Sequence, residues 1–462
     1  MSTFASSSYF AEVVYDPLSF FSMLPSRFLP TSWSTSLARS SILGFLQSAI
    51  KVGYLEITDS QGIHGFGTHK EGRKAVRITV NNDLFYVRVL ASADLGLSES
   101  YMMCDIDVDN LKGMMDLWLD NYDEMIGFDS TLSRLNAVVS GLYNAFLGQS
   151  LSRSRLNVMD AYDQSNDLFK GFLSEEMMYS CALWSDGEGG LRGDLLPTSQ
   201  PFDLEMAQLR KIHHVLTMAR VKPGMKVLEF GSGWGGMAIE AARSFGAEVD
   251  TLTLSIEQKT LAEERIRVAG LQDRIRVHLM DYRDMPIEWA GRFDAFVSVE
   301  MLEHVGTQHY ETYFKLVDWA LKDKNAAVVV TATTFPEARY RTYQPEDFMR
   351  RYMWPNSALP CATTLINAAT KASKNRFSVQ FVENHGAHYP RTLREWSRRL
   401  EANVTMDTMA KRYPGLRDPT AFETFKRKWR YLFAYAGAGF AKGYISCHMI
   451  TFYKNGMPAQ CD

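Results

Sequence analysis

Residues Val227-Leu228-Glu229-Phe230-Gly231-Ser232-Gly233-Trp234-Gly235-Gly236 decide the fold of this chain. The apolar run Lys226–Phe230 predicts a buried strand, and the glycines after it predict a tight turn into a helix. Glycine at positions 231 and 233 lets the backbone turn sharply and approach a ligand closely, which a Cβ atom would block. The helix that follows begins with free N–H groups. The stretch therefore predicts the first strand and the ligand-binding turn of a Rossmann-like domain.

Strand-like and helical segments alternate from this turn to the end of the chain. The predicted strands are Lys226–Phe230, Val249–Leu254, Ile275–Met280, Phe293–Val299 and Ala326–Thr333, with Phe377–Glu383 and Cys447–Tyr453 completing a set of seven. The predicted helices between them are Ala238–Phe245, Ile256–Val268 and Thr312–Leu321. Such alternation predicts an α/β domain whose mainly parallel seven-stranded sheet is covered on both faces.

The N-terminal part has a different pattern. Short apolar runs separated by glycine and charged turns predict a smaller β-rich or α+β unit, and they are Tyr54–Ile57, Ala75–Val80 and Leu84–Leu90. Helical periodicity follows over Leu132–Leu147, so we place the domain boundary at about residue 150, with domains at 1–150 and 151–462. The serine-rich stretch 22–41 predicts a flexible arm. The irregular aromatic and basic stretch at about 335–375 predicts a substrate cover.

Composition excludes several classes of protein. A formal net charge of −3 gives no general basic field for nucleic acid. The five cysteines are scattered without a CxxC pair, which argues against a disulfide framework and a metal site and favours a reducing, cytoplasmic compartment. No run reaches the ~20 apolar residues that span a bilayer.

The glycine turn alone leaves the cofactor open. A GxGxxG pattern occurs in sites for NAD, FAD and S-adenosylmethionine, and also in turns that serve tight packing only. A dinucleotide site usually has an acidic residue about twenty positions further on. That place holds Thr251-Leu252-Thr253-Leu254-Ser255, so NAD is disfavoured.

Five segments together resemble the cyclopropane fatty acid synthases and mycolic acid cyclopropane synthases, and the resemblance runs across residues 160–455. In family order they are Tyr162–Phe169 (YDQSNDLF), Met178–Ala182 (MYSCA), the glycine turn with Thr253–Gln258 (TLSIEQ), Glu300–Gly306 (EMLEHVG) and Trp354–Pro360 (WPNSALP). Gly96–Met102 (GLSESYM) is similar to the N-terminal domain of the longer members.

The resemblance implies a class I methyltransferase domain that binds S-adenosylmethionine. The implied cofactor-binding residues are Tyr179 and Ser180 at the methionine end, Gly231 and Gly233 beneath it, Thr253, Leu254 and Gln258 towards the ribose, and Asp281 and Tyr282 at the adenine. The implied reaction is methyl transfer to an unactivated alkene, which leaves a carbocation beside the new methyl group. Aromatic faces tolerate such a charge. The candidates are Phe172, Tyr179, Trp184, Tyr352 and Trp354.

In the family a bound bicarbonate ion takes the proton from the carbocation. Its implied holders here are Cys181, Glu303 and Tyr389, with Thr331 and Thr333 at the end of the fifth strand, before the turn that follows it. Three positions depart from the family pattern. Thr331 stands where many members have His or Gln, Ala161 stands in place of the His of an HYD segment, and Asn356-Ser357 replace a Gly-Gly pair.

These departures leave the substrate and product open. The leading interpretation is methylation or cyclopropanation of an unsaturated lipid acyl chain, giving a cyclopropane or a methyl branch. The same chemistry on a soluble polyketide or terpenoid alkene is a second interpretation, and a non-catalytic lipid-binding protein is a third.

Three basic clusters favour an enzyme that docks peripherally on an anionic membrane. They are Arg391, Arg394, Arg398 and Arg399; Lys426, Arg427, Lys428 and Arg430; and Arg339, Arg341, Arg350 and Arg351. Whether the chain is a monomer or a homodimer stays open.

Overall fold

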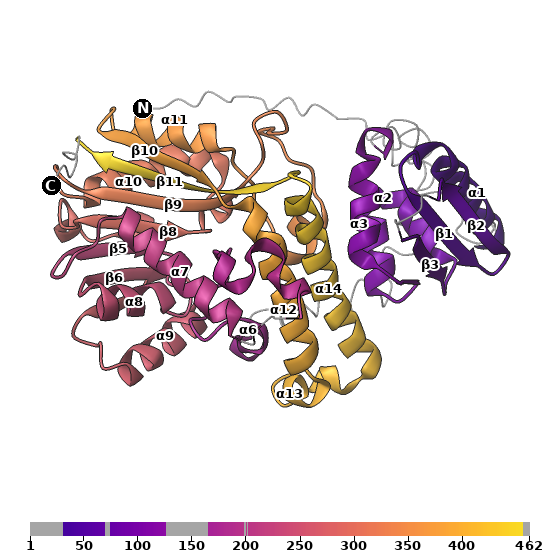
Figure 1. Ribbon diagram of the computed structural model, residues 1–462, viewed down its shortest axis with the longest axis horizontal. Helices are drawn as coiled ribbons and strands as arrows, with labels where there is room; N and C mark the ends of the chain where they lie inside the picture. Colours follow the sequence, from indigo (N-terminus) through magenta and orange to yellow (C-terminus); the bar gives the residue numbers. More distant parts are fainter. Residues whose placement is uncertain (1–30, 70–73, 126–164, 198–199, 201, 456–462) are drawn as a thin grey trace, which may run out of the picture.

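The computed structural model describes residues 31–69, 74–125, 165–197, 200 and 202–455. Its larger sheet has seven strands in the order β10-β11-β9-β8-β5-β6-β7 (Figure 1). The strands are β5 (Lys226–Phe230), β6 (Glu248–Thr253), β7 (Ile275–Leu279), β8 (Ala295–Val299), β9 (Ala327–Thr334), β10 (Phe377–Asn384) and β11 (Ser446–Lys454). Strand β11 runs antiparallel to both of its neighbours, β10 and β9, and the other pairs in this sheet are parallel. The predicted seven-stranded α/β fold is confirmed.

Helices cover both faces of this sheet because its strands are apolar on both faces. Val227 of β5 packs into one core cluster and the next residue, Leu228, into the other. The first cluster lies under α7 (Asp203–Met218), α8 (Gly236–Ser244) and α9 (Ile256–Val268). The second lies under α10 (Tyr310–Ala320) and α11 (Ala362–Ala372).

The strand order places a binding crevice beside β5. From β5 the chain continues outwards through β6 and β7, and then returns to β8 on the other side of β5. The loops after β5 and β8 therefore leave the sheet in opposite directions and open a crevice at the carboxyl ends of these strands. The glycine turn follows β5, and the EMLEHVG segment (300–306) follows β8.

The N-terminal unit is α+β, as predicted. Its four-stranded sheet has the order β2-β1-β3-β4. The elements are α1 (Thr31–Ala49), β1 (Tyr54–Asp59), β2 (Gly62–Gly67), β3 (Val76–Val80), α2 (Leu84–Met102), β4 (Ile106–Val108) and α3 (Leu111–Asp120).

Two local predictions in this unit are wrong. Residues 31–41, expected in a flexible arm, belong to α1, which buries Ala38, Ile42 and Leu46 along one side. Leu84–Leu90, which we expected to be one of the short runs of a β-rich unit, begins helix α2. A short apolar run fits a buried helix as well as a strand. Here the side chain of Asn82 favours the helix over a strand, because its oxygen accepts a hydrogen bond from the N–H of Leu84 at the start of α2.

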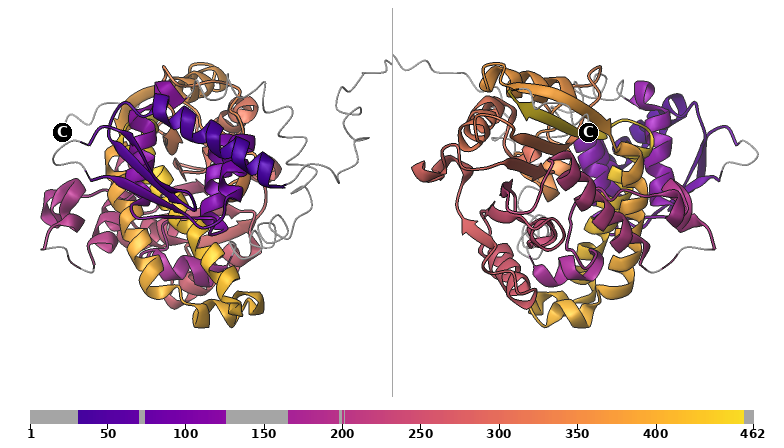
Figure 2. Two further views of the ribbon diagram at one scale, coloured as in Figure 1. Left: turned by 90° about the vertical axis from the view of Figure 1, so that its right-hand side faces the viewer. Right: turned by 60° about the vertical axis from the view of Figure 1, so that its left-hand side comes forward.

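The C-terminal helices join the two units. Helices α6 (Asn166–Phe172), α12 (Tyr389–Asn403) and α13 (Met406–Ala410) pack beside the long helix α14 (Pro419–Ala441), which lies against α2 and α3. Figure 2 (left) shows the indigo N-terminal elements in front of these orange and yellow helices. Arg427 of α14 donates hydrogen bonds to the carbonyls of Tyr101 (3.0 Å) and Ile106 (2.8 Å).

The predicted cover is shorter than expected. Residues 335–361 are irregular apart from a π-helical turn at Met349–Met353, but Ala362–Ala372 forms α11 and packs on the sheet.

The predicted helix Leu132–Leu147 and the domain boundary near residue 150 lie outside the described residues. Among the helices that are described, none has the length and hydropathy that crossing a bilayer requires.

Candidate active site

A cavity of about 1510 Å³ opens at the carboxyl ends of β5 and β8. Drug-sized ligands occupy about 300–1,000 Å³, so this cavity has room for more than one small molecule. All nine residues predicted to bind the cofactor line it, and they come from the segment before α7 and the loops after β5, β6 and β7. They are Tyr179, Ser180, Gly231, Gly233, Thr253, Leu254, Gln258, Asp281 and Tyr282.

The glycine turn forms the floor of this cavity. Gly231 and Gly233 have φ of +88° and +47°, in the left-handed region that favours glycine. A Cβ added at Gly233 would meet no protein atom within 4 Å, so it would project into open space. Glu229 lines the cavity next to the turn, and its buried Oε2 has no protein partner. Burial raises the pKa of Glu229 to about 7. A close backbone approach and a free buried acceptor fit a nucleoside cofactor.

The ends of β6 and β7 add polar groups to the same part of the cavity. Thr253 donates to the Oε1 of Gln258 (2.8 Å), which holds both side chains at the start of α9. Arg283 binds both oxygens of Asp281 and lowers the pKa of that carboxyl. The ring of Tyr282 stacks on Phe230 at 5.4 Å. The individual ribose and adenine contacts stay predictions.

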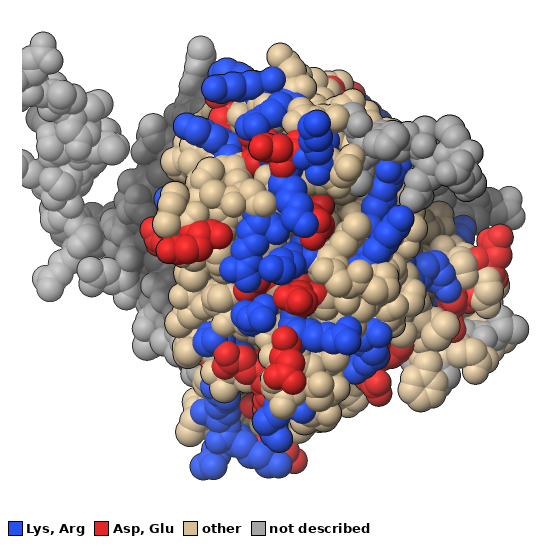
Figure 3. Space-filling model, turned by 90° about the vertical axis from the view of Figure 1, so that its left-hand side faces the viewer, with Lys and Arg blue, Asp and Glu red and all other residues tan. Residues whose placement is uncertain are grey.

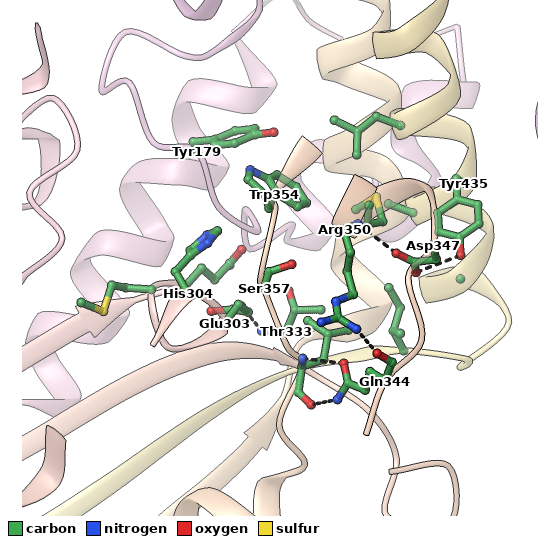
Figure 4. Close-up of a pocket in the computed structure, with 18 of the residues that line it drawn as sticks. Tyr179, Glu303, His304, Thr333, Gln344, Asp347, Arg350, Trp354, Ser357 and Tyr435 are labelled. Atoms are coloured by element: carbon green, nitrogen blue, oxygen red, sulfur yellow. Dashed lines mark hydrogen bonds between the residues drawn. The ribbon is translucent and has the colours of Figure 1, made fainter. Parts of the chain in front are cut away.

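Aromatic side chains form a wall around the middle of the cavity. Tyr179 and Trp354 lie there, as predicted, with ring centroids 6.2 Å apart (Figure 4). Phe169 and Trp396 also line the cavity, 5.2 and 5.1 Å from Tyr179, and the sequence did not single them out.

The other three aromatic candidates do not line this cavity. Phe172 is fully buried in the core, and Trp184 binds the carbonyl of His388. Tyr352 donates to Glu99 of the N-terminal unit. The prediction that these three face the reacting carbons is therefore wrong, because packing partners distant in the sequence turn them elsewhere.

Glu303 lines the cavity, as predicted. Its Oε1 accepts a hydrogen bond from the backbone N–H of Thr333 (2.5 Å), while its buried Oε2 has no protein partner. Burial, and after it the charge of Glu300, raise the pKa of Glu303 to about 8. At neutral pH this carboxyl is therefore mainly protonated.

The other predicted bicarbonate holders gather around Glu300. The N–H of Cys181 donates to Glu300 Oε1 (2.8 Å), and the hydroxyl of Tyr389 donates to Oε2 (2.5 Å). Thr331 accepts from the backbone N–H of Glu300 (3.1 Å) and does not line the cavity. The ammonium of Lys211, almost fully buried, lies 3.9 Å from Oε1 and donates to Ser180 (2.7 Å).

These contacts do not fit a bicarbonate ion held as the sequence implied. Two of the residues expected to hold it, Cys181 and Tyr389, already donate to a carboxylate of the chain, through the backbone N–H and the hydroxyl. A second anion against the same donors would meet the charge of Glu300. Thr331 contacts the backbone of Glu300, so its expected role at the ion is not seen either.

Sequence reasoning missed Glu300, although a signal was present. Glu300 directly follows β8, and side chains at the carboxyl end of a parallel strand often face the ligand. Lys211 lies in the interior of α7, where nothing in the sequence sets it apart from a surface lysine.

The family departures have local explanations. Asn356 has φ of +65° and so adopts the conformation that the replaced glycine would favour, which asparagine tolerates better than most residues. Ser357 is buried and lines the cavity beside Glu303 (Figure 4). Ala161 lies outside the described residues.

In two of the three basic clusters the charges are buried or paired with acidic residues. Arg391 is fully buried and binds Asp203 at 2.9 Å. Its neighbours on α12 are also paired, as Arg394–Asp194, Arg398–Glu395 and Arg399–Glu205. In the second cluster Lys428 is buried, and the pairs are Lys426–Glu401, Arg427–Asp107 and Arg430–Glu401. Acidic residues distant in the sequence neutralise both clusters.

Among the described residues, the face opposite the N-terminal unit carries charges of both signs (Figure 3). Figure 3 shows Lys and Arg interleaved with Asp and Glu over it. The third cluster differs, because Arg339, Arg341 and Arg350 line the cavity and Arg351 is exposed nearby.

One group of side chains has the spacing of metal ligands, although the sequence indicated no metal site. His214, Glu383 and His385 lie together, half-buried, and His214 already binds Glu383 at 2.9 Å. None of the three lines the large cavity.

The seven-stranded sheet, with its single antiparallel strand β11 and its glycine turn facing a deep cavity, matches class I S-adenosylmethionine-dependent methyltransferases. Residues 149–450 match the family described as mycolic acid cyclopropane synthetase. The chain belongs to this family, as its motifs predicted, and its cofactor is S-adenosylmethionine.

Relatives support this assignment over most of the chain. Tuberculostearic acid methyltransferase UfaA1 of Mycobacterium tuberculosis is 32% identical over 367 residues, which cover 79% of this chain and 80% of that protein. Cyclopropane-fatty-acyl-phospholipid synthase of Escherichia coli is 32% identical over 373 residues, covering 79% and 85%. A solved mycolic acid cyclopropane synthase, CmaA1 with SAH and CTAB bound, is 25% identical with a TM-score of 0.51, covering 65% of this chain and 98% of that one.

Proposed function

We propose that this enzyme transfers a methyl group from S-adenosylmethionine to a carbon–carbon double bond in the acyl chain of a lipid. The observation that carries the proposal is the extent of the cavity. It begins at the glycine turn, passes the aromatic wall and ends among apolar side chains of the N-terminal unit and α14. A nucleoside cofactor accounts for the first part only.

The far end of the cavity suits a hydrocarbon chain. Its lining is mainly apolar, with Ser92, Asp94 and Tyr435 as polar members, and comes from three elements that Figure 1 shows close together, α2, α3 and α14. These residues are Leu90, Leu95, Met115, Trp118, Leu119, Leu432 and Ala436. Burying an acyl chain here gains roughly 0.8 kcal/mol for each methylene group removed from water.

The side chains between the glycine turn and the apolar end of the cavity suit methyl transfer to an alkene. Bound S-adenosylmethionine supplies an electrophilic methyl group. The faces of Tyr179, Trp354 and Trp396 can stabilise positive charge on the alkene carbon next to the one methylated. The apolar lining excludes water that would otherwise add to that carbon.

The product depends on which proton leaves the cation. Loss from the transferred methyl group closes a cyclopropane ring, and loss from a chain carbon leaves a methyl branch on a retained double bond. The names of the relatives, a tuberculostearic acid methyltransferase and a fatty-acyl-phospholipid synthase, support an acyl lipid as the substrate.

Peripheral docking on an anionic cytoplasmic membrane surface forms part of the proposal. The segment 339–351 lies at the cavity and carries the one basic cluster that stays at the surface, and Tyr343 beside it is 82% exposed. Each Lys or Arg near an anionic surface contributes about 1 kcal/mol.

The test is an assay of purified protein with labelled S-adenosylmethionine. One arm contains anionic vesicles of monounsaturated phospholipid, a second contains saturated phospholipid, and a third contains soluble terpenoid and polyketide alkenes. We expect label only in unsaturated phospholipid, with mass spectrometry identifying ring or branch. Label in a soluble alkene alone would replace the lipid substrate with the small-molecule alternative.

A further inference from the structure

Glu300 has the surroundings of a catalytic group rather than of a structural one. Its carboxylate lines the cavity, yet it is held by four groups from other parts of the chain, which are Cys181 N–H, Tyr389 O–H, the Cys447 thiol and the Lys211 ammonium. A buried carboxylate with a nearby cation and two donors is kept charged. The site therefore presents a fixed negative charge to whatever occupies the cavity.

The backbone of Glu300 supports the same view. Its φ of +51° lies in the left-handed region, which costs energy for a residue with a side chain. The position directly after β8 would suit glycine better. Residues held in such conformations cluster at active sites, where their surroundings enforce a required direction of the side chain.

We propose that the Glu300 carboxylate is the base that removes the proton from the carbocation, in the place that bicarbonate occupies in the family resemblance. This inference rests on the proposed alkene methylation. The reason is positional, since the donors expected to hold the ion hold Glu300 instead.

The bonds and charges balance with the groups present. The alkene electron pair forms the new bond to the methyl carbon, and the electron pair of the broken S–CH₃ bond stays on sulfur. Glu300 then takes a proton from the cation, and the C–H electron pair becomes the third ring bond or a double bond. Glu300 becomes neutral and returns its proton to solvent when the product leaves.

Glu303 is less suited to this role. Burial raises its pKa to about 8, so at neutral pH it is mainly a neutral acid, which is a far weaker base than a carboxylate. We assign to Glu303 a positioning role as a hydrogen-bond donor at the cavity wall.

The first experiment compares Glu300→Gln with the wild type. The amide keeps the shape of the side chain but cannot accept a proton, so we expect kcat to fall at least about 100-fold. The affinity for S-adenosylmethionine, measured by calorimetry, should stay within about threefold. The matched control is Glu264→Gln on the exposed surface of α9, which should keep the wild-type kcat.

The second experiment separates an internal base from a bound ion. Wild-type activity should not change in buffer freed of carbon dioxide. Glu300→Gly relieves the backbone strain and removes the carboxylate. The Cys181 N–H and the Tyr389 hydroxyl then become free to bind a small anion. We expect this variant to be inactive without carbonate and to regain at least tenfold activity with added bicarbonate or formate.

Two results would overturn the inference. One is a wild-type rate that collapses without carbonate and returns when bicarbonate is added. The other is a Glu300→Gln variant that keeps the wild-type kcat. Failure of the proposed substrate is distinguishable, because the same comparison can be made on whichever alkene the wild-type enzyme methylates.

Discussion

Tyr389 offers a clean test of how the base is held. Its hydroxyl donates to Glu300 Oε2, while its ring stacks on Phe440 with centroids 4.2 Å apart and planes 15° apart. Tyr389→Phe therefore removes the donor and keeps the stacking. Hydrogen bonds to charged groups contribute about 1.5–3 kcal/mol. If the whole of that contribution serves to hold the base, kcat falls by about 10- to 150-fold.

The assay is the initial rate of methyl incorporation into monounsaturated phospholipid at saturating S-adenosylmethionine. Thermal melting should show a folded variant, and calorimetry should show an unchanged cofactor affinity. Tyr453→Phe is the matched control, since its hydroxyl accepts a hydrogen bond of 2.8 Å from Arg220 and does not line the cavity. The reasoning fails if Tyr389→Phe turns over at the wild-type rate, because the hydroxyl would then contribute nothing to the step.

Three further predictions address the cofactor, Glu303 and the docking of the two units. Gly233→Val should abolish S-adenosylmethionine binding in calorimetry while the protein stays folded, because the side chain would project into the cavity. Glu303→Gln should raise the melting temperature by an amount that grows from pH 5 to pH 8. The wild-type carboxyl keeps its proton in the folded state up to about 8 but loses it above about 4.5 when unfolded. A gain in melting temperature that shrinks as the pH rises would contradict this prediction. Arg427→Ala should lower the free energy of unfolding, measured in denaturant melts, by roughly 1.5–3 kcal/mol, because it removes the hydrogen bonds to the N-terminal unit. The control is Arg417→Ala at an exposed position, which should leave the free energy of unfolding unchanged.

Much of the fold was accessible to local patterns. The strand Lys226–Phe230 and the helix Ile256–Val268 have the predicted bounds, because alternation and glycine placement reflect burial on a sheet and a required backbone turn. The errors lie where local patterns are ambiguous. Leu84–Leu90 is a short run that is apolar except for Arg88, and a run of that kind does not distinguish a strand from a buried helix.

The cofactor pocket was also accessible to the sequence. Its residues follow strands, and the carboxyl ends of parallel strands meet at one edge of the sheet. The family resemblance implied Gly233, Thr253 and Asp281, and the order of the strands explains why these residues line one cavity.

The sequence by itself determined the order of strands and helices, the glycine turn and the set of residues at the cofactor end. Only the tertiary structure decided which charges meet. Glu300 binds groups 119 and 89 positions away, in Cys181 and Tyr389. Arg391 binds Asp203, 188 positions away, so it belongs to the interior and not to a membrane-facing surface. Periodicity records whether a position is buried, whereas the partner that neutralises a buried charge is set by how distant segments pack.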